Sequence, residues 1–369
     1  MEIIDKNEKI CYKSDCRFFI GEKPCKYGQK FPCKYYRPDF KKILIIKLGS
    51  LGDILRTTSI LSRIKKEYKY SEITWLTSEE GIRLLEKVPL IDKIVSVNSP
   101  ETFLLLAEEF DFLMSFDKDY KAISIAKLVN ARKKMGFTLN SHGKLGIFNY
   151  ESDYAYRLGL DDELKFKKNR LTYQQMIFKM VGWEWNGEDY EWDLSEKDIF
   201  KFSYLRKKGD KIIAIHPGFG KKFPMKYWPL KNWENLVELL KEKNYKVLLC
   251  GGEEERKLLS DLTENTQQPV YIFDDFVDFS SFVANVDIMV TLDSFAMHMA
   301  LASAISVISL FGPTSSVEIE GYGRLCKLSR ELECSPCYMS KCLKKHECLD
   351  ELFPEIVVEE IEKCVNKNL

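Results

Sequence analysis

The sequence has no excess of charge of either sign, no long apolar run and no glycine fingerprint of a dinucleotide or P-loop site. Lys plus Arg and Asp plus Glu number 56 each, so no net field concentrates nucleic acid or anionic lipid around the chain. No window approaches the about eighteen apolar residues of a membrane span, and residues 1–16 lack the apolar core of an export signal. We therefore expect a cytoplasmic protein that binds no nucleic acid and has at most peripheral contact with a membrane.

The apolar segments predict an α/β protein of two domains. A chain of 369 residues is long for one domain and sufficient for two that each close a core. From Lys42 onward, short apolar runs alternate with amphipathic stretches, which is the pattern of helices packed on a mostly parallel sheet. A polar, aromatic stretch from about residue 161 to 208 interrupts this pattern. We take it as the connection between two doubly wound units.

The predicted strands fall into two series. The first series is KILIIKLG, EITWLT, KIVSV, FDFLMSF and KKMGF. The second series is KIIAIHP, KVLLCGG, PVYIF, VDIMVTL and ISVISLFGP. The chain accordingly divides into a cysteine-rich segment at 1–40, a Rossmann-like domain at 41–205, a second Rossmann-like domain at 206–330, and a cysteine-rich segment with a C-terminal helix at 331–369.

The turn after the first predicted strand carries the candidate catalytic residue. Doubly wound sheets bind ligands beyond the carboxyl ends of their strands, and KLGSLGD occupies that place. Gly49 and Gly52 let the backbone approach a ligand closely, and Asp53 comes at the start of the next helix. Asp53 can act as general base toward an acceptor hydroxyl, with Lys47 at the rim of the cleft. The alternative is that Asp53 only caps its helix.

Two turns of the second half carry residues suited to a nucleotide. In HPGFGKKFPMKYWP, glycine amides and lysine charges suit a diphosphate, and the candidates are Gly218, Lys222 and Lys226. The alternative is a solvated basic loop. In CGGEEER, Glu253 can accept hydrogen bonds from ribose hydroxyls, or it only adds a favourable charge at a helix start.

Two further turns extend this candidate donor site. TLDSFAMHMALA opens a helix with Asp293 and Ser294, where free backbone amides can bind phosphate. His298, one helical turn later, can reach the same phosphate or be a buried structural histidine. Thr314 follows in LFGPT and is expected near the cleft.

The cysteines form two clusters at opposite ends of the chain. The C-terminal cluster has the spacing C-x2-C-x4-C-x5-C, with His346 inside it, and such a compact set of thiols predicts a structural zinc or iron site. The alternative is a loop of reduced surface thiols. The N-terminal cluster has looser spacing, and we expect packing against the body to order that segment. The two clusters are Cys334, Cys337, Cys342 and Cys348, and Cys11, Cys16, Cys25 and Cys33.

Seven segments, taken in order, carry a resemblance to a known family. They are ILIIKLGSLGDILRTTSIL, EITWLT, IHPGFGKKFPMKYWP, LLCGGEEE, VTLDSFAMHMALA, SLFGPTSSVEIEGYG and CSPCYMSKCLKKHECLDELFPEIV. From about residue 42 to 360, the chain resembles the bacterial ADP-heptose glycosyltransferases, the heptosyltransferase family nine.

The resemblance implies a GT-B architecture, with two Rossmann-like domains facing a central cleft. It implies inverting, metal-independent transfer of L-glycero-D-manno-heptose from ADP-heptose to a sugar hydroxyl of the lipopolysaccharide inner core. The first domain then holds the acceptor and the second holds the ADP-sugar donor. A glycolipid acceptor implies at most peripheral contact with the inner membrane.

The resemblance also assigns roles by position. Asp53 matches the catalytic aspartate of the family, and Lys226 matches the lysine that contacts the donor phosphates. Glu253 falls at the ribose or adenine contact. The family motif D-[ST]-G-x-x-H is matched by Asp293, Ser294 and His298. Phe295 replaces the glycine of that motif, which fits a shifted diphosphate or a different donor sugar.

Other functions stay open at this point. The acceptor can be a protein hydroxyl instead of a glycolipid, and the same scaffold can bind a nucleotide-sugar without transferring it. A nicotinamide-dependent dehydrogenase is disfavoured because its fingerprint is missing. No cofactor is expected for catalysis, since no D-x-D motif follows a strand of the second half, and DKD at 117–119 is interpreted as a surface pair.

Overall fold

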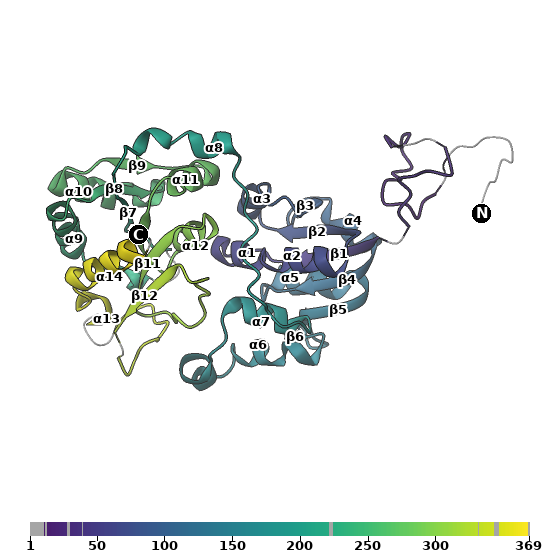
Figure 1. Cartoon of the computed structure of the whole chain (residues 1–369). Coiled ribbons are helices and arrows are strands. Elements are labelled where there is room, and N and C mark those ends of the chain that lie inside the picture. The colour runs from purple at the N-terminus through teal and green to yellow at the C-terminus, as the bar shows by residue number, and fades with distance from the viewer. Residues whose placement is uncertain are drawn as a thin grey trace.

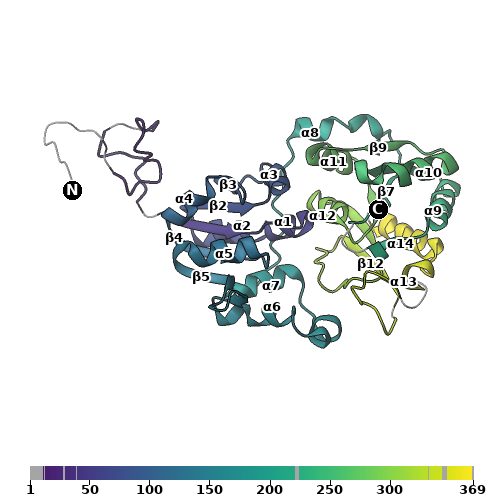
Figure 2. The same cartoon turned by 180° about the vertical axis from the view of Figure 1, so that it is seen from behind.

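The computed structural model describes residues 11, 13–27, 30–38, 40–220, 224–330, 332–342 and 347–367. These residues form two α/β halves side by side, with an N-terminal segment beyond the outer edge of the first half (Figure 1). Figure 2 shows the same arrangement from behind. Within these ranges, no helix is both long and apolar enough to cross a membrane.

The first half is built on one sheet. Its strands are β1 (Lys41–Ile46), β2 (Ser71–Thr77), β3 (Lys93–Ser96), β4 (Glu109–Ser115), β5 (Asn130–Leu139) and β6 (Leu145–Ile147). They lie in the order β3-β2-β1-β4-β5-β6, all parallel except β6, which runs antiparallel to β5. β1 is central and buried from Ile43 to Ile46, because helices cover both faces of a parallel sheet.

The helices of this half follow the strands. They are α1 (Leu51–Thr57), α2 (Ile60–Glu67), α3 (Glu79–Leu85), α4 (Thr102–Ala107), α5 (Tyr120–Leu128), α6 (Asp153–Arg157) and α7 (Tyr173–Met180). Local capping fixes several starts: Ser78 accepts from the Gly81 amide at the start of α3, and Thr172 forms a capping box with Gln175 at the start of α7. These hydrogen bonds fix the residues at which the two helices begin.

The second half repeats the same plan. Its strands are β7 (Ile212–His216), β8 (Lys246–Gly251), β9 (Val270–Ile272), β10 (Ile288–Leu292), β11 (Ser306–Phe311) and β12 (Leu325–Ser329). They are parallel and lie in the order β12-β11-β10-β7-β8-β9. In both sheets the first and fourth strands of the half are neighbours, β1 beside β4 and β7 beside β10.

The helices of the second half include the C-terminal one. They are α8 (Glu196–Phe200), α9 (Leu230–Glu242), α10 (Arg256–Thr266), α11 (Phe276–Val283), α12 (Phe295–Ala302), α13 (Glu347–Asp350) and α14 (Pro354–Lys367). α14 packs on α9, and its Val357 and Ile361 belong to the same apolar core as β7 and β8. The C-terminal helix is therefore part of the second half.

All ten predicted strands are present, and β6 and β12 are additional. The connection from 161 to 208 is also more structured than its composition indicates. α7 packs on α1 and α2 of the first half, and α8 packs on α11 of the second. The halves meet where α1 contacts α12 (Figure 1).

Candidate active site

A cleft of about 750 Å³ lies where the two halves face each other. In each sheet the strand order reverses between the first and fourth strands, and doubly wound sheets bind ligands beyond the carboxyl ends at such switch points. The cleft lining comes mainly from the turns after β1, β7, β8, β9, β10 and β11. Its lining includes Gly52, Asp53, Arg56, Lys165, Gly220, Lys226, Glu255, Asp293, Ser294, His298, Thr314 and Glu318.

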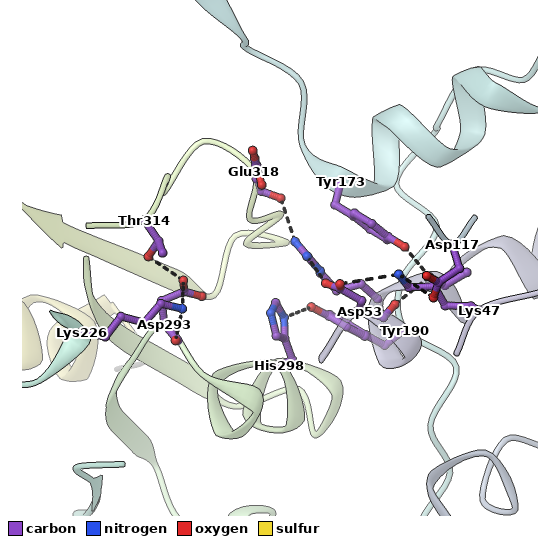
Figure 3. Close-up of polar contacts among 12 residues, drawn as sticks. Lys47, Asp53, Asp117, Tyr173, Tyr190, Lys226, Asp293, His298, Thr314 and Glu318 are labelled. Atoms are coloured by element: carbon purple, nitrogen blue, oxygen red, sulfur yellow. Dashed lines mark hydrogen bonds and ion pairs between the residues drawn. The ribbon is translucent and has the colours of Figure 1, made fainter. Parts of the chain in front are cut away.

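Asp53 lies between two cations. Its Oδ1 pairs with Arg56, one turn later on α1, and its Oδ2 is 3.6 Å from Lys47 Nζ (Figure 3). Burial raises the pKa of Asp53, but the charges of Arg56 and Lys47 outweigh burial and hold that pKa well below its usual range. Asp53 is therefore ionised at neutral pH, as a general base has to be, although the two cations limit its basicity.

Asp53 is not the cap of its helix. The N-cap of α1 is Ser50, and its side chain forms no capping hydrogen bond. The carboxylate of Asp53 instead faces Arg56 and Lys47. The alternative interpretation of Asp53 as only a helix cap is therefore not supported.

Asp117 fixes the turn that precedes Asp53. Its Oδ2 accepts from the amides of Leu48 at 2.9 Å and Gly49 at 3.3 Å, and it lies 3.5 Å from Lys47 Nζ. Asp117 is 8% exposed and Lys47 is 6% exposed. The expectation of a surface pair is thus wrong for Asp117, and Lys47 is held beneath the cleft and not at its rim, because the end of β4 lies directly beside the end of β1.

Arg56, which the sequence did not single out, connects the two halves. Its guanidinium carbon lies 4.2 Å from the centre of the Tyr173 ring, and its Nη1 donates to the carbonyl of Glu318 at 3.3 Å. Its Nε is buried and has no hydrogen-bond partner among the described residues. These contacts hold the Arg56 guanidinium beside Asp53 where the two halves meet.

Lys226 and Asp293 form the centre of the donor side. Lys226 Nζ lies 2.6 Å from Asp293 Oδ2 and donates to the Asp293 carbonyl at 2.9 Å, and the Thr314 hydroxyl donates to the same Oδ2 at 2.7 Å. Burial raises the pKa of Asp293, but Lys226 and Thr314 outweigh burial and lower it. The aspartate thus positions both a cation and a hydroxyl at the start of α12.

The first turn of α12 opens onto the cleft. Ser294 is its N-cap, and Ser294, Phe295 and Ala296 all line the cleft. The first amides of a helix have no partner within the helix and attract anions. The Phe295 ring lies 5.3 Å from that of Phe276, so the residue that replaces the family glycine forms part of an aromatic wall.

His298 lies at the junction of the halves. Its Nδ1 is 2.9 Å from the Tyr190 hydroxyl, and a Cβ at Gly52 would stand 2.7 Å from its Cδ2. Burial, assisted by the nearby Arg56 charge, lowers the pKa of His298 to about 3. His298 is therefore neutral at physiological pH and acts as a hydrogen-bonding group, without a charge.

Glu255 occupies the place that the sequence assigned to Glu253. The Glu255 side chain packs over Gly218 and Gly251, where a Cβ at Gly218 would overlap it, and its Oε2 accepts from the Gly252 amide at 2.9 Å. Glu253 lies outside the cleft lining and pairs with Arg256 at the surface. The reason is the 3-10 turn at Glu253–Glu255, which carries the third glutamate back over the glycines.

Two other candidates lie apart from the cleft lining. Gly49 contacts Asp117 as described above, and Gly218 is buried beneath Glu255. Lys222 lies outside the described residues.

The four C-terminal cysteines lie near one another beside the cleft. Burial, with smaller effects from Cys337, Cys342 and Cys334, raises the pKa of Cys348 to about 11. The Cys337 amide donates to the Pro313 carbonyl at 3.0 Å, so this segment packs on the turn that carries Thr314. Within the described ranges, no three His, Cys, Asp or Glu side chains are arranged to hold a metal ion, and His346 lies outside those ranges. No disulfide joins any of the eleven cysteines.

Comparisons with known proteins show the family and the fold of the chain. The model of glycosyltransferase family 9 (heptosyltransferase) matches residues 104–347. Lipooligosaccharide heptosyltransferase 2 of Campylobacter jejuni is 24% identical over 340 residues, which are 87% of this chain and 98% of that protein.

A glycosyltransferase family 9 structure from Veillonella parvula superposes with a TM-score of 0.68 at 18% identity, covering 89% of this chain and 98% of the other. The ADP-heptose lipopolysaccharide heptosyltransferase II of Escherichia coli superposes with a TM-score of 0.65 at 16% identity, covering 89% and 99%. The predicted GT-B architecture is confirmed.

Proposed function

The chain belongs to glycosyltransferase family 9, the heptosyltransferases, and from this we propose that it transfers a heptose from ADP-heptose to a sugar hydroxyl of the lipopolysaccharide inner core, with inversion at the anomeric carbon. The observation that carries the proposal is the placement of the Asp53 carboxylate and the Lys226 ammonium on opposite sides of one cleft. One group suits deprotonation of an acceptor, and the other suits a departing diphosphate.

On the acceptor side, Asp53 takes the proton of the attacking hydroxyl as the new glycosidic bond forms. Arg56 and Lys47 keep Asp53 ionised, but they also weaken it as a base. Proton transfer is therefore expected late, when bond formation has made the hydroxyl more acidic.

On the donor side, Lys226 and the amides at the start of α12 stabilise the charge that develops on the leaving ADP. The Tyr190 hydroxyl and His298 Nδ1 share a hydrogen bond of 2.9 Å. We assign the hydroxyl as its donor, so that Nε2 of the neutral His298 ring carries the proton and donates to a phosphate oxygen. Because these groups already supply positive charge and donors, we propose catalysis without a divalent metal. Glu255, over the glycines of β7 and β8, accepts from ribose hydroxyls.

The proposed glycolipid acceptor places the reaction at the cytoplasmic surface of the inner membrane, to which the protein binds peripherally. A purified-enzyme assay tests the proposal. ADP-heptose, ADP-glucose and UDP-glucose are each supplied with heptose-deficient lipopolysaccharide, and nucleotide release and acceptor mass are followed. Heptose addition with ADP-heptose alone is the expected result. Transfer to a protein acceptor instead, transfer from another donor, or binding without transfer would each contradict it.

We also propose that Cys334, Cys337, Cys342 and Cys348 hold a structural zinc or iron ion. The proposal is supported by proximity, because Cys334, Cys337 and Cys342 all lie near enough to Cys348 to help raise its pKa. The segment also packs on the turn that carries Pro313 and Thr314. Four thiolates suit either metal. Replacing Cys334 and Cys337 by Ser should remove one equivalent of metal and weaken ADP binding, because the turn that carries Thr314 loses its support. Unchanged metal content would contradict the site.

A further inference from the structure

The described residues between 11 and 37 form a small unit of their own, called the N-terminal unit below. In both views this segment stands beyond the outer edge of the first half, away from the junction of the two halves (Figures 1 and 2). Its described residues form turns and bends and contain neither a helix nor a strand. Contacts with the body come from arginines, with Arg17 pairing with Asp92 and Arg37 lying 5.4 Å from the centre of the Tyr70 ring. Packing against the body, which the sequence led us to expect, does not account for the interior of this unit.

The interior of the unit is a small cavity surrounded by thiols. The four N-terminal cysteines all line it, although their spacing is C-x4-C-x8-C-x7-C and successive loops have to converge to bring them there. Four aromatic residues complete the lining. The cavity is lined by Cys11, Cys16, Cys25, Cys33, Phe18, Phe19, Tyr35 and Tyr36.

Backbone turns direct two of these cysteines. The Cys16 amide donates to the Lys13 carbonyl at 3.0 Å, and the Phe19 amide donates to the Cys16 carbonyl at 2.9 Å. After Cys33, the amide of Tyr35 donates to the Cys33 sulfur at 3.4 Å. This hydrogen bond and the two backbone turns fix the local chain direction at Cys16 and Cys33.

Apolar burial alone does not explain how these loops are held. Chains below about 40 residues seldom close a core without a disulfide, a metal or a partner. Several large aromatic side chains of the unit are also partly exposed to solvent: Tyr27 is 39% exposed, and Phe31 and Tyr35 are each 37% exposed. No disulfide joins the cysteines. A different cross-link is therefore needed at the cavity.

The sequence of the unit carries an excess of positive charge. Residues 11–37 contain seven Lys or Arg and two Asp or Glu, which gives a net charge of +5. Four thiolates around a divalent ion carry a charge of about −2, which this excess of cations neutralises.

We propose that Cys11, Cys16, Cys25 and Cys33 bind one thiolate-preferring transition ion, zinc or iron, and that this ion holds the N-terminal unit together. Within the described ranges no three such side chains are already arranged as ligands, so the thiols have to rotate inward to close the tetrahedron. The site is structural, because it lies away from the cleft. It is also separate from the C-terminal cluster and does not depend on the proposed transferase activity.

Elemental analysis of the full chain, purified without chelator, tests this site. The test variant replaces Cys16 and Cys33 by Ser, and the matched control is Cys364→Ser on α14, outside both clusters. We expect the double variant to contain one equivalent less of zinc or iron than the wild type and the control. Visible charge-transfer bands identify iron, and their absence together with zinc in the analysis identifies zinc.

Limited proteolysis gives a second readout that does not require activity. Chelator should expose residues 11–37 of the wild type to cleavage while the two halves stay intact, and the double variant should be cleaved there without chelator. A Cys33→His variant, which keeps a zinc ligand, should retain partial protection. Equal metal content in the double variant and the wild type would overturn the proposal. So would two disulfides among the four cysteines in a non-reduced digest.

Discussion

Gly52 of the first half and His298 of the second half touch, so that a Cβ at position 52 would stand 2.7 Å from His298 Cδ2. This contact joins α1 and α12, which follow the first strand of one sheet and the fourth strand of the other. Asp53 comes directly after Gly52, and Ser294 caps the helix of His298. The missing side chain at position 52 therefore sets the spacing between the proposed base and the proposed donor site.

Gly52→Ala should destabilise the protein by about 1–3 kcal/mol, the usual cost of overpacking, although alanine favours a helix by about 0.5–1 kcal/mol over glycine. Denaturant unfolding measures the change. Gly49→Ala is the matched control, since a Cβ there meets nothing within 4 Å. An equal loss in both variants would show that the His298 contact is not the cause, and removal of the His298 ring in the double variant should restore part of the loss.

Lys226→Ala should weaken ADP binding about ten- to hundredfold, which corresponds to about 1.5–3 kcal/mol for a hydrogen bond to a charged group. The physical reason is the loss of an ammonium that Asp293 holds at the start of α12. Titration calorimetry of ADP gives the affinity. Lys231→Ala, an exposed lysine at the start of α9, is the control and should bind as the wild type does. Unchanged affinity in Lys226→Ala would remove this lysine from the donor site.

Glu255→Gln should weaken ADP binding, because a carboxylate that accepts from ribose hydroxyls is replaced by a weaker acceptor. Glu253→Gln, two residues away and paired with Arg256 at the surface, should leave the affinity as it is. The comparison decides which glutamate of the run faces the nucleotide. A larger effect from Glu253 than from Glu255 would refute the assignment.

The free energy of unfolding should decrease as the pH is lowered, and His298 should account for part of this decrease. The folded-state pKa of His298 is about 3, below its ordinary value, so the unfolded state binds more protons between about pH 6.5 and pH 3. The contribution is complete above pH 6.5 and is lost on acidification, at up to about 1.4 kcal/mol per pH unit. His298→Asn keeps an acceptor for Tyr190 and should flatten this slope. Burial lowers the pKa of His216 as well, so part of the slope should remain.

Unfolding free energies measured at several pH values between 4 and 7 check this prediction. His142→Asn is the matched control, because His142 is exposed and its replacement should leave the slope as in the wild type. An unchanged slope in His298→Asn would show that this histidine is not held neutral by burial.

The fold was largely predictable because buried parallel strands appear in the sequence as continuous apolar runs. β1 and β10 illustrate this, with KKILII and IMVTL buried along most of their lengths. β12 was not predicted because its LCKLS is short and half polar. β12 pairs with β11. The local sequence pattern of β12 does not indicate that it forms this pairing.

The sequence predicted which turns at the carboxyl ends of the strands form the candidate site. It did not predict which way individual side chains of those turns point. Asp53, Asp293 and His298 reach the cleft because the helices that carry them start there. The choice between Glu253 and Glu255 depends on a 3-10 turn, which three consecutive glutamates do not reveal. The burial of Lys47 depends on Asp117, which is distant in sequence and adjacent in the sheet.

The proposed mechanism depends most directly on Asp53 as the general base. The test is the single-turnover rate at which the Asp53→Asn variant transfers heptose from ADP-heptose to heptose-deficient lipopolysaccharide. The rate should fall by about 10² to 10⁴-fold, the usual contribution of a positioned base, while ADP-heptose affinity stays near that of the wild type. Asp119→Asn, which alters an exposed cap of α5, is the matched control and should keep the wild-type rate. A rate near that of the wild type in a folded Asp53→Asn protein would contradict the proposed mechanism.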